Sequence, residues 1–190
     1  MRARTGALRL AVLRFTVVLC VVISLPVGPA LCPAQTLLSP DTLLQSIPQL
    51  SVTVSAPASV SSGDTAGQVY TATVRNGSAT RIAYSLTLSA TLPATGFSYV
   101  LGSSTIVSRT GTIAHNESTG AGTVTWTPTT AFDLGAGESI TLTFRLRTAC
   151  NALSGQMLRV WANYQDAPGG TGYSASCWTN ITVGSGNLVV

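Results

Sequence analysis

The sequence contains no lysine, a single histidine and few charged side chains of any kind. Charged residues make up 8% of its 190 residues, and all of the positive side-chain charge comes from ten arginines. Nucleic-acid binding gains affinity from clustered Lys and Arg that displace the counterions of phosphates. We therefore expect no nucleic-acid partner, and a phosphate-binding loop built around lysine is excluded.

Catalytic side chains are scarce as well. The one histidine, His115, stands in a stretch rich in Gly, Ser and Thr at 111–122, which we interpret as a mobile loop. His115 has the chemistry of a general base beside Glu117, but an exposed loop histidine is the favoured interpretation. The nucleophile elbow Gly-x-Ser-x-Gly is absent. We expect a non-catalytic protein without a cofactor, and a secreted hydrolase is the least favoured alternative.

The acidic residues are spread over predicted turns rather than gathered in one motif. Calcium sites are built from the oxygen ligands of such loops, whereas a single Asp more commonly caps its own turn through the backbone. We favour turn capping and predict no metal site. The residues concerned are Asp64, Asp133, Glu138 and Asp166.

The first 34 residues have the pattern of a signal peptide. Arginines at positions 2, 4 and 9 precede an apolar run from Phe15 to Leu25. This run has the length of a signal-peptide hydrophobic region and is short for a membrane span. Cleavage before Gln35 is favoured, cleavage after Ala30 is the second choice, and a lipoprotein signal at Cys32 is a less favoured alternative. We predict a secreted, extracellular or cell-surface protein with no membrane span in the mature chain.

Removal of this leader changes the electrostatics. Four of the ten arginines lie within it, and the remaining six are balanced by six acidic residues, all of which follow position 34. The mature chain therefore has no formal net charge. The positive charge of the whole sequence is no evidence for an acidic partner.

Two cysteines follow the leader, Cys150 and Cys177. A pair of cysteines in an exported protein predicts one disulfide. Closing this loop of about 28 residues would stabilise the fold by roughly 3–4 kcal/mol in the chain-entropy model. A redox or metal-binding pair is the alternative, but such pairs need closer spacing or further ligands.

From position 49 onward, apolar and polar residues alternate with a period of two, which is typical of half-buried strands. Turn signals such as Asn76-Gly77 separate the runs. Seven or more short strands without a helical pattern favour an all-β, immunoglobulin-like antiparallel β-sandwich of about seven to nine strands. The alternating runs are Leu50–Ser55, Tyr70–Arg75, Arg81–Leu88, Thr123–Thr127, Ile140–Arg147, Leu158–Tyr164 and Tyr173–Val183.

We assign this sandwich to residues 49–184, as one domain. The stretch 35–48, with two prolines around a leucine-rich segment, is predicted to be a linker or docking arm. Residues 185–190 begin with a Gly/Ser hinge and continue into what we interpret as the start of a further strand or repeat.

One predicted hairpin brings two tryptophans together on the outer face of the sandwich. The Gly-Gly pair at 169–170 suits a two-residue hairpin loop, because glycine tolerates positive φ. A loop at that position places Trp161 opposite Trp178 and Cys177 opposite Ala162. The tryptophan pair is then either a stabiliser of the hairpin or a flat aromatic platform for a sugar or a neighbouring module.

Several segments carry a resemblance to a known family. They are Val69–Asn76, a strand that ends in Asn; Ala90–Ala94 and Gly96–Val100, an LPxG-like passage; Leu134–Leu142, with Gly-x-Gly-Glu-Ser; and Asn187–Val190, the opening of a following repeat. Together they resemble a conserved-repeat domain of unknown function (the DUF-eleven type) of bacterial and archaeal surface proteins. Close relatives of that repeat occur in isopeptide-forming fimbrial and adhesin-like proteins. The resemblance covers residues 66–190.

The resemblance implies an immunoglobulin-like module that spaces or displays something at a cell surface, and it implies no reaction. The isopeptide crosslinks of such fimbrial proteins join a Lys amine to an Asn or Asp side chain. A chain without lysine cannot form that bond internally, so the predicted disulfide is the candidate staple.

Two functions remain. The favoured one is a structural stalk, fimbrial or adhesin repeat, whose partners are neighbouring repeats or other surface proteins joined by strand addition. The alternative is a carbohydrate-binding or other ligand-binding sandwich that uses exposed Trp161 and Trp178. The ligand-binding function requires that these tryptophans face solvent beside an unfilled groove, and this feature distinguishes it from the structural function.

Overall fold

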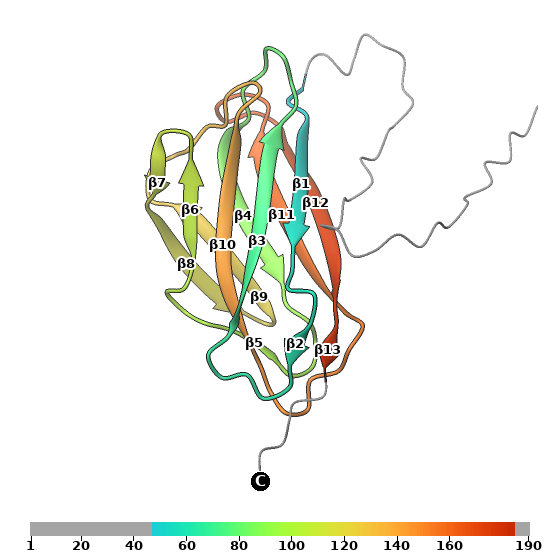
Figure 1. Cartoon of the computed structure of the whole chain (residues 1–190). Helices are drawn as coiled ribbons and strands as arrows, with labels where there is room; N and C mark the ends of the chain where they lie inside the picture. Colours follow the sequence, from blue (N-terminus) through green and yellow to red (C-terminus); the bar gives the residue numbers. More distant parts are fainter. Residues whose placement is uncertain (1–46, 185–190) are drawn as a thin grey trace, which may run out of the picture.

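The computed structural model describes residues 47–184, and every regular element in this part of the chain is a β-strand. Thirteen strands form two antiparallel sheets that pack face to face, together with one short parallel pair (Figure 1). The predicted signal peptide at 1–34, residues 35–46 of the predicted arm at 35–48, and the tail at 185–190 lie outside the described residues. Residues 47–184 include no helix long and apolar enough to span a membrane.

The first sheet contains six strands and the second contains five. The order in the first is β1 (Leu50–Ser55), β3 (Gln68–Asn76), β10 (Ser139–Thr148), β6 (Thr105–Ser108) and β7 (Gly111–Ile113), with β5 (Phe97–Tyr99) also paired to β10. The order in the second is β12 (Gly172–Ile181), β11 (Gln156–Gln165), β4 (Tyr84–Thr91), β9 (Thr123–Pro128) and β8 (His115–Gly120). The short strands β2 (Val60–Ser61) and β13 (Val183–Gly184) pair in parallel at one end of the sandwich (Figure 1).

The central strand β10 shows why these segments fold as strands. Its even-numbered residues from Ile140 to Leu146 are buried, whereas Thr and Arg alternate on its outer side. Threonine suits the outward positions because its branched side chain packs well on a pleated surface. Burial of each large apolar side chain contributes about 1.5–3 kcal/mol, so the alternation decides which face of the strand turns inward.

Aromatic rings join the two sheets at the centre of the core. Trp126 of β9 is fully buried, and its ring centre lies 5.1 Å from that of Phe144 on β10. Phe144 in turn stacks on Tyr70 of β3 at 5.8 Å, and Tyr99 of β5 meets Trp126 edge-on at 5.8 Å. Such pairs contribute about 0.5–1.5 kcal/mol each beyond the area that they bury.

These observations confirm the predicted all-β, immunoglobulin-like antiparallel sandwich. Eight of the thirteen strands have six or more residues, which agrees with the predicted number, and the other five are two to four residues long. The short strands gave little alternating signal in the sequence because each spans at most two full periods.

The mobile loop predicted at 111–122 is wrong, because most of this stretch forms strands. β7 pairs with β6, and β8 pairs along its whole length with β9. Both are edge strands of their sheets. An edge strand exposes more of its side chains to water than a central strand does, so polar residues and glycines replace the apolar alternation there.

A β-bulge at Ser85 shifts the phase of the alternation in β4. Ser85 has a φ of 53°, in the left-handed region, and the pairing of β4 with β11 breaks register between Asn163 and Gln165. The extra residue places Ala83 in the core and leaves Ile82, which the alternation assigns to the inner face, 39% exposed. Period-two patterns do not reveal such a bulge, because one inserted residue looks like an ordinary strand position.

The hairpin between β11 and β12 turns one residue earlier than predicted. The Gly170 N–H donates to the Ala167 carbonyl at 2.9 Å, which closes a turn with Pro168 and Gly169 at its centre. Proline suits the first central position of such a turn, and Gly169 occupies the second with a φ of 70°. The centre of the hairpin is therefore fixed by the Pro-Gly pair and not by the Gly-Gly pair.

The earlier turn changes which residues face each other. Trp161 lies opposite Ser176, and Trp178 lies opposite Arg159. The predicted direct pairing of the two tryptophans is therefore wrong. They are diagonal neighbours on the outer face, a relationship that still brings aromatic side chains within reach of each other.

The predicted disulfide between Cys150 and Cys177 is not formed in the structure. Cys150 is exposed, with a free thiol, in the turn that follows β10. Cys177 is buried in the middle of β12, where it lies opposite Val160 and not Ala162. Strand β10 ends at Thr148 and the chain then turns, so Cys150 does not continue the inward alternation of that strand.

Candidate functional site

The outer face of β11 and β12 carries the exposed apolar side chains of the second sheet. Met157 on β11 is 59% exposed, and Trp178 on β12 is 54% exposed. Trp161 lies on the same side of β11 and is half-buried. Because strand residues alternate sides, these three side chains form one surface patch, which we call the tryptophan patch. Exposed apolar patches of this kind commonly mark interaction sites.

Arg159 lies between the two tryptophans. It is directly opposite Trp178 across the strands and two residues before Trp161 along β11. Its guanidinium carbon is 5.7 Å from the centre of the Trp161 ring, and its Nη2 donates to Ser176 Oγ at 3.1 Å. The cation–π contact and the hydrogen bond hold the guanidinium over the ring. Arg159 is the one charged residue among the outward positions of β11 and β12.

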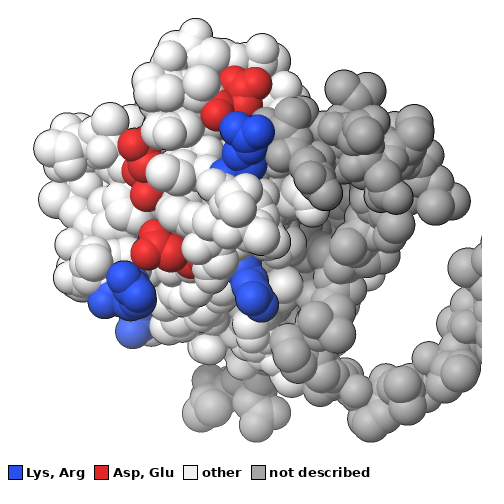
Figure 2. Space-filling view, turned by 90° about the horizontal axis from the view of Figure 1, so that it is seen from above, with Lys and Arg blue, Asp and Glu red and all other residues white. Residues whose placement is uncertain are grey.

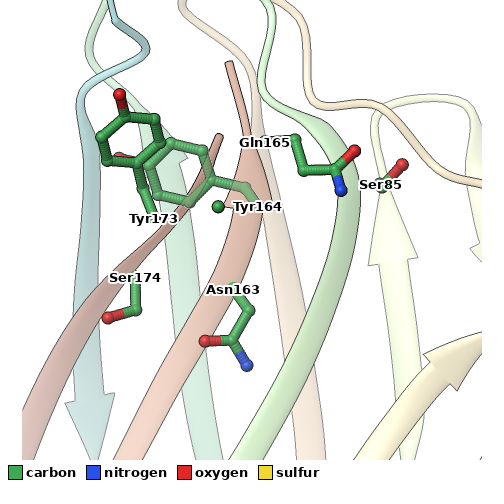
Figure 3. Close-up of a pocket in the computed structure, with 7 residues that line it drawn as sticks. Ser85, Asn163, Tyr164, Gln165, Tyr173 and Ser174 are labelled. Atoms are coloured by element: carbon green, nitrogen blue, oxygen red, sulfur yellow. The ribbon is translucent and has the colours of Figure 1, made fainter. Parts of the chain in front are cut away.

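A hollow of about 380 Å³ adjoins the tryptophan patch. Asn163 is the next outward residue after Trp161, so the two features are continuous along β11. Tyr164 and Tyr173, whose ring centres lie 5.8 Å apart, are also among its lining residues, although the Tyr164 side chain is buried on the inner side of β11. None of its lining side chains carries a formal charge. The lining residues are Ser85, Asn163, Tyr164, Gln165, Gly172, Tyr173 and Ser174 (Figure 3).

The β-bulge and a glycine create the space for this hollow. Ser85 is held in its left-handed conformation by its N–H, which donates to Asp133 Oδ1 at 2.9 Å. Gln165 lies opposite Gly172, which has no side chain to fill the space between β11 and β12. Bulges commonly redirect side chains beside binding sites. Sequence reasoning missed the hollow because it depends on the pairing of β4 with β11.

His115 and Glu117 lie together at the opposite edge of the second sheet, where Ser104 joins them; we call these three residues the edge cluster. His115 Nε2 is 2.6 Å from Ser104 Oγ, and the Ser104 hydroxyl donates to Glu117 Oε1. The Tyr99 hydroxyl donates to the same carboxylate at 2.6 Å, and the Gly102 N–H donates to its other oxygen at 2.7 Å. Glu117 therefore ties β8 to β5 and to the loop that follows β5.

The hydrogen-bond pattern of the edge cluster differs from that of a Ser-His-acid triad. In a triad the carboxylate accepts from His Nδ1, whereas His115 Nδ1 here lies 3.1 Å from the Ile113 carbonyl. Glu117 instead accepts directly from Ser104. The side chains of His115 and Glu117 are 10% and 12% exposed. This geometry suits a hydrogen-bonded closure of the sheet edge.

Hydrogen bonding keeps the carboxylate of the edge cluster ionised. Burial raises the pKa of Glu117, but the hydrogen bonds from Ser104, Tyr99 and the Gly102 N–H outweigh it, so its pKa lies below the ordinary value. For Tyr99, burial and the hydrogen bond to Glu117 raise the pKa of the phenol. Tyr99 therefore stays protonated and able to donate to Glu117.

The other acidic side chains of the described chain bond to nearby backbone groups or side chains. Asp64 accepts from the N–H groups of Ala66 and Gly67 and from the Gln68 amide. Glu138 accepts from the Gly135 N–H at 3.0 Å. Within residues 47–184, no three His, Cys, Asp or Glu side chains gather as metal ligands would.

Charge is sparse on the surface seen in Figure 2. Blue and red side chains are scattered over a mainly uncharged end of the molecule, and both signs are interspersed. No extended patch of one sign forms on this face of the described residues. The view therefore offers no basic surface of the kind that nucleic-acid binding uses.

No family model and no curated protein matches the sequence. Among solved structures, the chain is similar to a variant of BcpA, the major pilin subunit of Bacillus cereus, with 9% identity and a TM-score of 0.52 over 73% of this chain and 40% of that one. It is also similar to the full-length major pilin SpaD from Corynebacterium diphtheriae, with 11% identity and a TM-score of 0.46 over 70% of this chain and 34% of the pilin. A third similar structure is AvmM, which catalyses macrocyclization in alchivemycin A biosynthesis. The identity is 12% and the TM-score is 0.42, over 75% of this chain and 93% of AvmM.

The likeness to BcpA shows that this chain has the fold of a bacterial pilin domain. The chain spans less than half the length of either pilin, and at these identities the likeness concerns the fold alone. The sequence resemblance to the DUF-eleven repeat stays a prediction.

Proposed function

We propose that the chain is a non-catalytic structural module of a cell surface, which works by assembling with neighbouring modules. The observation that carries this proposal is the likeness of its fold to a major pilin subunit, at a TM-score of 0.52. The signal-peptide pattern at 1–34 and the sequence resemblance to fimbrial repeats support the same role. Because one fold serves many functions, the proposal is tested through assembly.

The polar chemistry of the described residues supports a structural role. Asn76, at the end of β3, is fully buried. Its Nδ2 donates to the carbonyls of Arg81 at 2.7 Å and Leu134 at 3.0 Å, and its Oδ1 accepts from the Ser78 N–H at 3.1 Å. With no lysine in the sequence, this asparagine joins chain segments through hydrogen bonds and not through an isopeptide bond.

The edge strand β12 is the best candidate for contact with a neighbouring module. It has ten residues, and its sequence from Gly172 to Ile181 contains neither proline nor a charged residue. Edge strands that must not pair with other chains are usually short, charged, bulged or interrupted by proline. A strand from a neighbouring module would extend the second sheet at this edge by backbone hydrogen bonding.

Substitution of one edge residue by lysine tests this role. Asn180 is exposed on β12, and Thr91 is exposed on the central strand β4 of the same sheet. Asn180→Lys should reduce the mass of assemblies of the exported protein, because a buried charge at a strand–strand contact is unfavourable. Thr91→Lys adds the same charge away from the edge and should leave assembly unchanged. Analytical ultracentrifugation and negative-stain electron microscopy measure both.

Two results would overturn the proposal. One is a wild-type protein that stays monomeric at all concentrations and forms no filament with other surface proteins of its source. The other is an equal effect of both lysine substitutions, which would indicate a general response to charge. Assays for hydrolysis of common ester, peptide and glycoside substrates complete the test, since turnover by the wild-type protein contradicts a non-catalytic role.

A further inference from the structure

A second surface feature goes beyond the structural role. The tryptophan patch and the hollow form one continuous strip along the outer face of β11 and β12. From the patch to the hollow, the outward residues of β11 are Met157, Arg159, Trp161, Asn163 and Gln165. Successive outward positions are about 7 Å apart, so the strip is long enough for several units of a linear ligand.

The hollow offers hydrogen bonds in both directions without any charge. Asn163 and Gln165 each provide an amide donor and an amide acceptor, and the hydroxyls of Ser85 and Ser174 do both. Asn163 lies directly opposite Ser174 across β11 and β12. A hollow with these groups suits a ligand that is itself covered with hydroxyl groups.

The tryptophan patch adds flat apolar surface beside these polar groups. Trp178 is 54% exposed, and Arg159 covers part of the neighbouring Trp161 ring. One N–H of Arg159 donates to Ser176, and a guanidinium group has five N–H donors in all. Aromatic faces pack on the C–H faces of sugar rings, while nearby amides and guanidinium groups bond to sugar hydroxyls.

Backbone strain at the hollow is an independent indication of function. Ser85 has a positive φ of 53° although it is not glycine. Such residues persist where the surrounding structure holds them, and they cluster at binding sites. The strained Ser85 and the register break between Asn163 and Gln165 occur at the same place, which is the wall of the hollow.

We propose that the outer face of β11 and β12 binds a carbohydrate chain. One sugar unit occupies the hollow, where the amides of Asn163 and Gln165 orient it. The following units lie across Trp161 and Trp178. A sugar fits this strip better than an apolar ligand because four neutral polar side chains line its hollow end, and it fits better than a nucleic acid because Arg159 is the one charge present.

A direct binding measurement tests the proposal. The exported protein is screened on a glycan array and then titrated with the best soluble hexasaccharide, with chitohexaose and cellohexaose included in every case. Tryptophan fluorescence should change on binding. Trp178→Ala and Asn163→Ala should each raise the dissociation constant at least tenfold. Val107→Ala, on the outer face of the first sheet, is the matched control and should change it less than twofold.

Each outcome decides the proposal. Thermal unfolding of every variant shows whether the fold is kept, and Asn163→Ala serves as a second, exposed-site variant if Trp178→Ala unfolds. Absence of binding to every arrayed glycan overturns the proposal, as does equal weakening by Val107→Ala. If no glycan binds and Trp178→Ala lowers the mass of assemblies, the strip is a contact between modules. If a sugar binds and Trp178→Ala leaves the mass of assemblies unchanged, carbohydrate binding is separate from the structural role.

Discussion

Tyr164 donates its hydroxyl hydrogen to the carbonyl oxygen of Pro48 at 2.9 Å, across 116 residues of sequence. Tyr164 stands near the end of β11, and Pro48 precedes β1, so this bond joins the first residues of the described chain to the second sheet. Both residues are buried. The bond holds Pro48, just before β1, against the second sheet.

Tyr164→Phe should lower the free energy of unfolding by about 1–2 kcal/mol, because the buried Pro48 carbonyl loses its donor. Urea denaturation measures the change. Tyr173→Phe is the matched control, since the Tyr173 hydroxyl is 3.5 Å from Asp166 and half-exposed, and it should cost about 0.5 kcal/mol or less. Equal losses in the two variants would contradict the importance of the Tyr164 bond.

Asn76→Ala should destabilise the fold by about 2–3 kcal/mol. The substitution leaves the carbonyls of Arg81 and Leu134 without the donor that the structure gives them. Asn163→Ala removes the same side chain from an exposed position and should change stability by about 0.5 kcal/mol or less. A comparison of the two denaturation midpoints at constant slope separates loss of stability from a change in compactness.

Stability should fall in acid partly through Glu117. Its pKa is lower in the folded protein than the ordinary value of 4.5, so the folded state binds fewer protons than the unfolded state. The stabilisation is fully present above that ordinary value and is lost as pH falls through the lowered pKa. Asp64, whose pKa is also lowered, contributes with the same sign.

Glu117→Gln isolates the share of the edge cluster in this acid dependence. At neutral pH the substitution should cost about 2 kcal/mol, because three hydrogen bonds to a charged acceptor become bonds to a neutral one. Denaturation at several pH values should show a smaller difference between the variant and the wild type as the pH falls below 4.5. A constant difference across this range would be evidence against an ionised Glu117 in the fold.

Native alkylation should modify Cys150, because its thiol is free and exposed. Cys150→Ser should abolish this labelling in the mature protein, since Cys177 is buried. Mass spectrometry after alkylation under native conditions measures both. Complete resistance of native Cys150 to alkylation would favour the disulfide that the sequence suggested.

The alternation of apolar and polar residues was enough to predict the fold class. In β3, β10 and β11 it identified both the strand and the buried face, because burial of a large side chain outweighs other local preferences. It also identified the strand at Thr123–Thr127, whose apolar residue Trp126 is fully buried. These features depend on one strand and its own face, which a single sequence contains.

Features that depend on two strands at once were decided only by the tertiary structure. The turn at Pro168-Gly169 set the register of the hairpin, so that Trp161 faces Ser176 and not Trp178. The bulge at Ser85 opened the hollow. At each position, two local conformations have similar energies, and the packing of the rest of the sheet determines which one forms.

The sequence by itself determined a lysine-free chain whose period-two pattern folds as a sandwich, and it predicts export. Only the tertiary structure brought Ser104, His115 and Glu117 into one cluster and left Cys150 free at a strand end. The physical reason is the distance along the sequence over which each kind of interaction acts. Burial is set by the side chain and its nearest neighbours in the chain, whereas contacts between loops and edges follow from how distant strands pair.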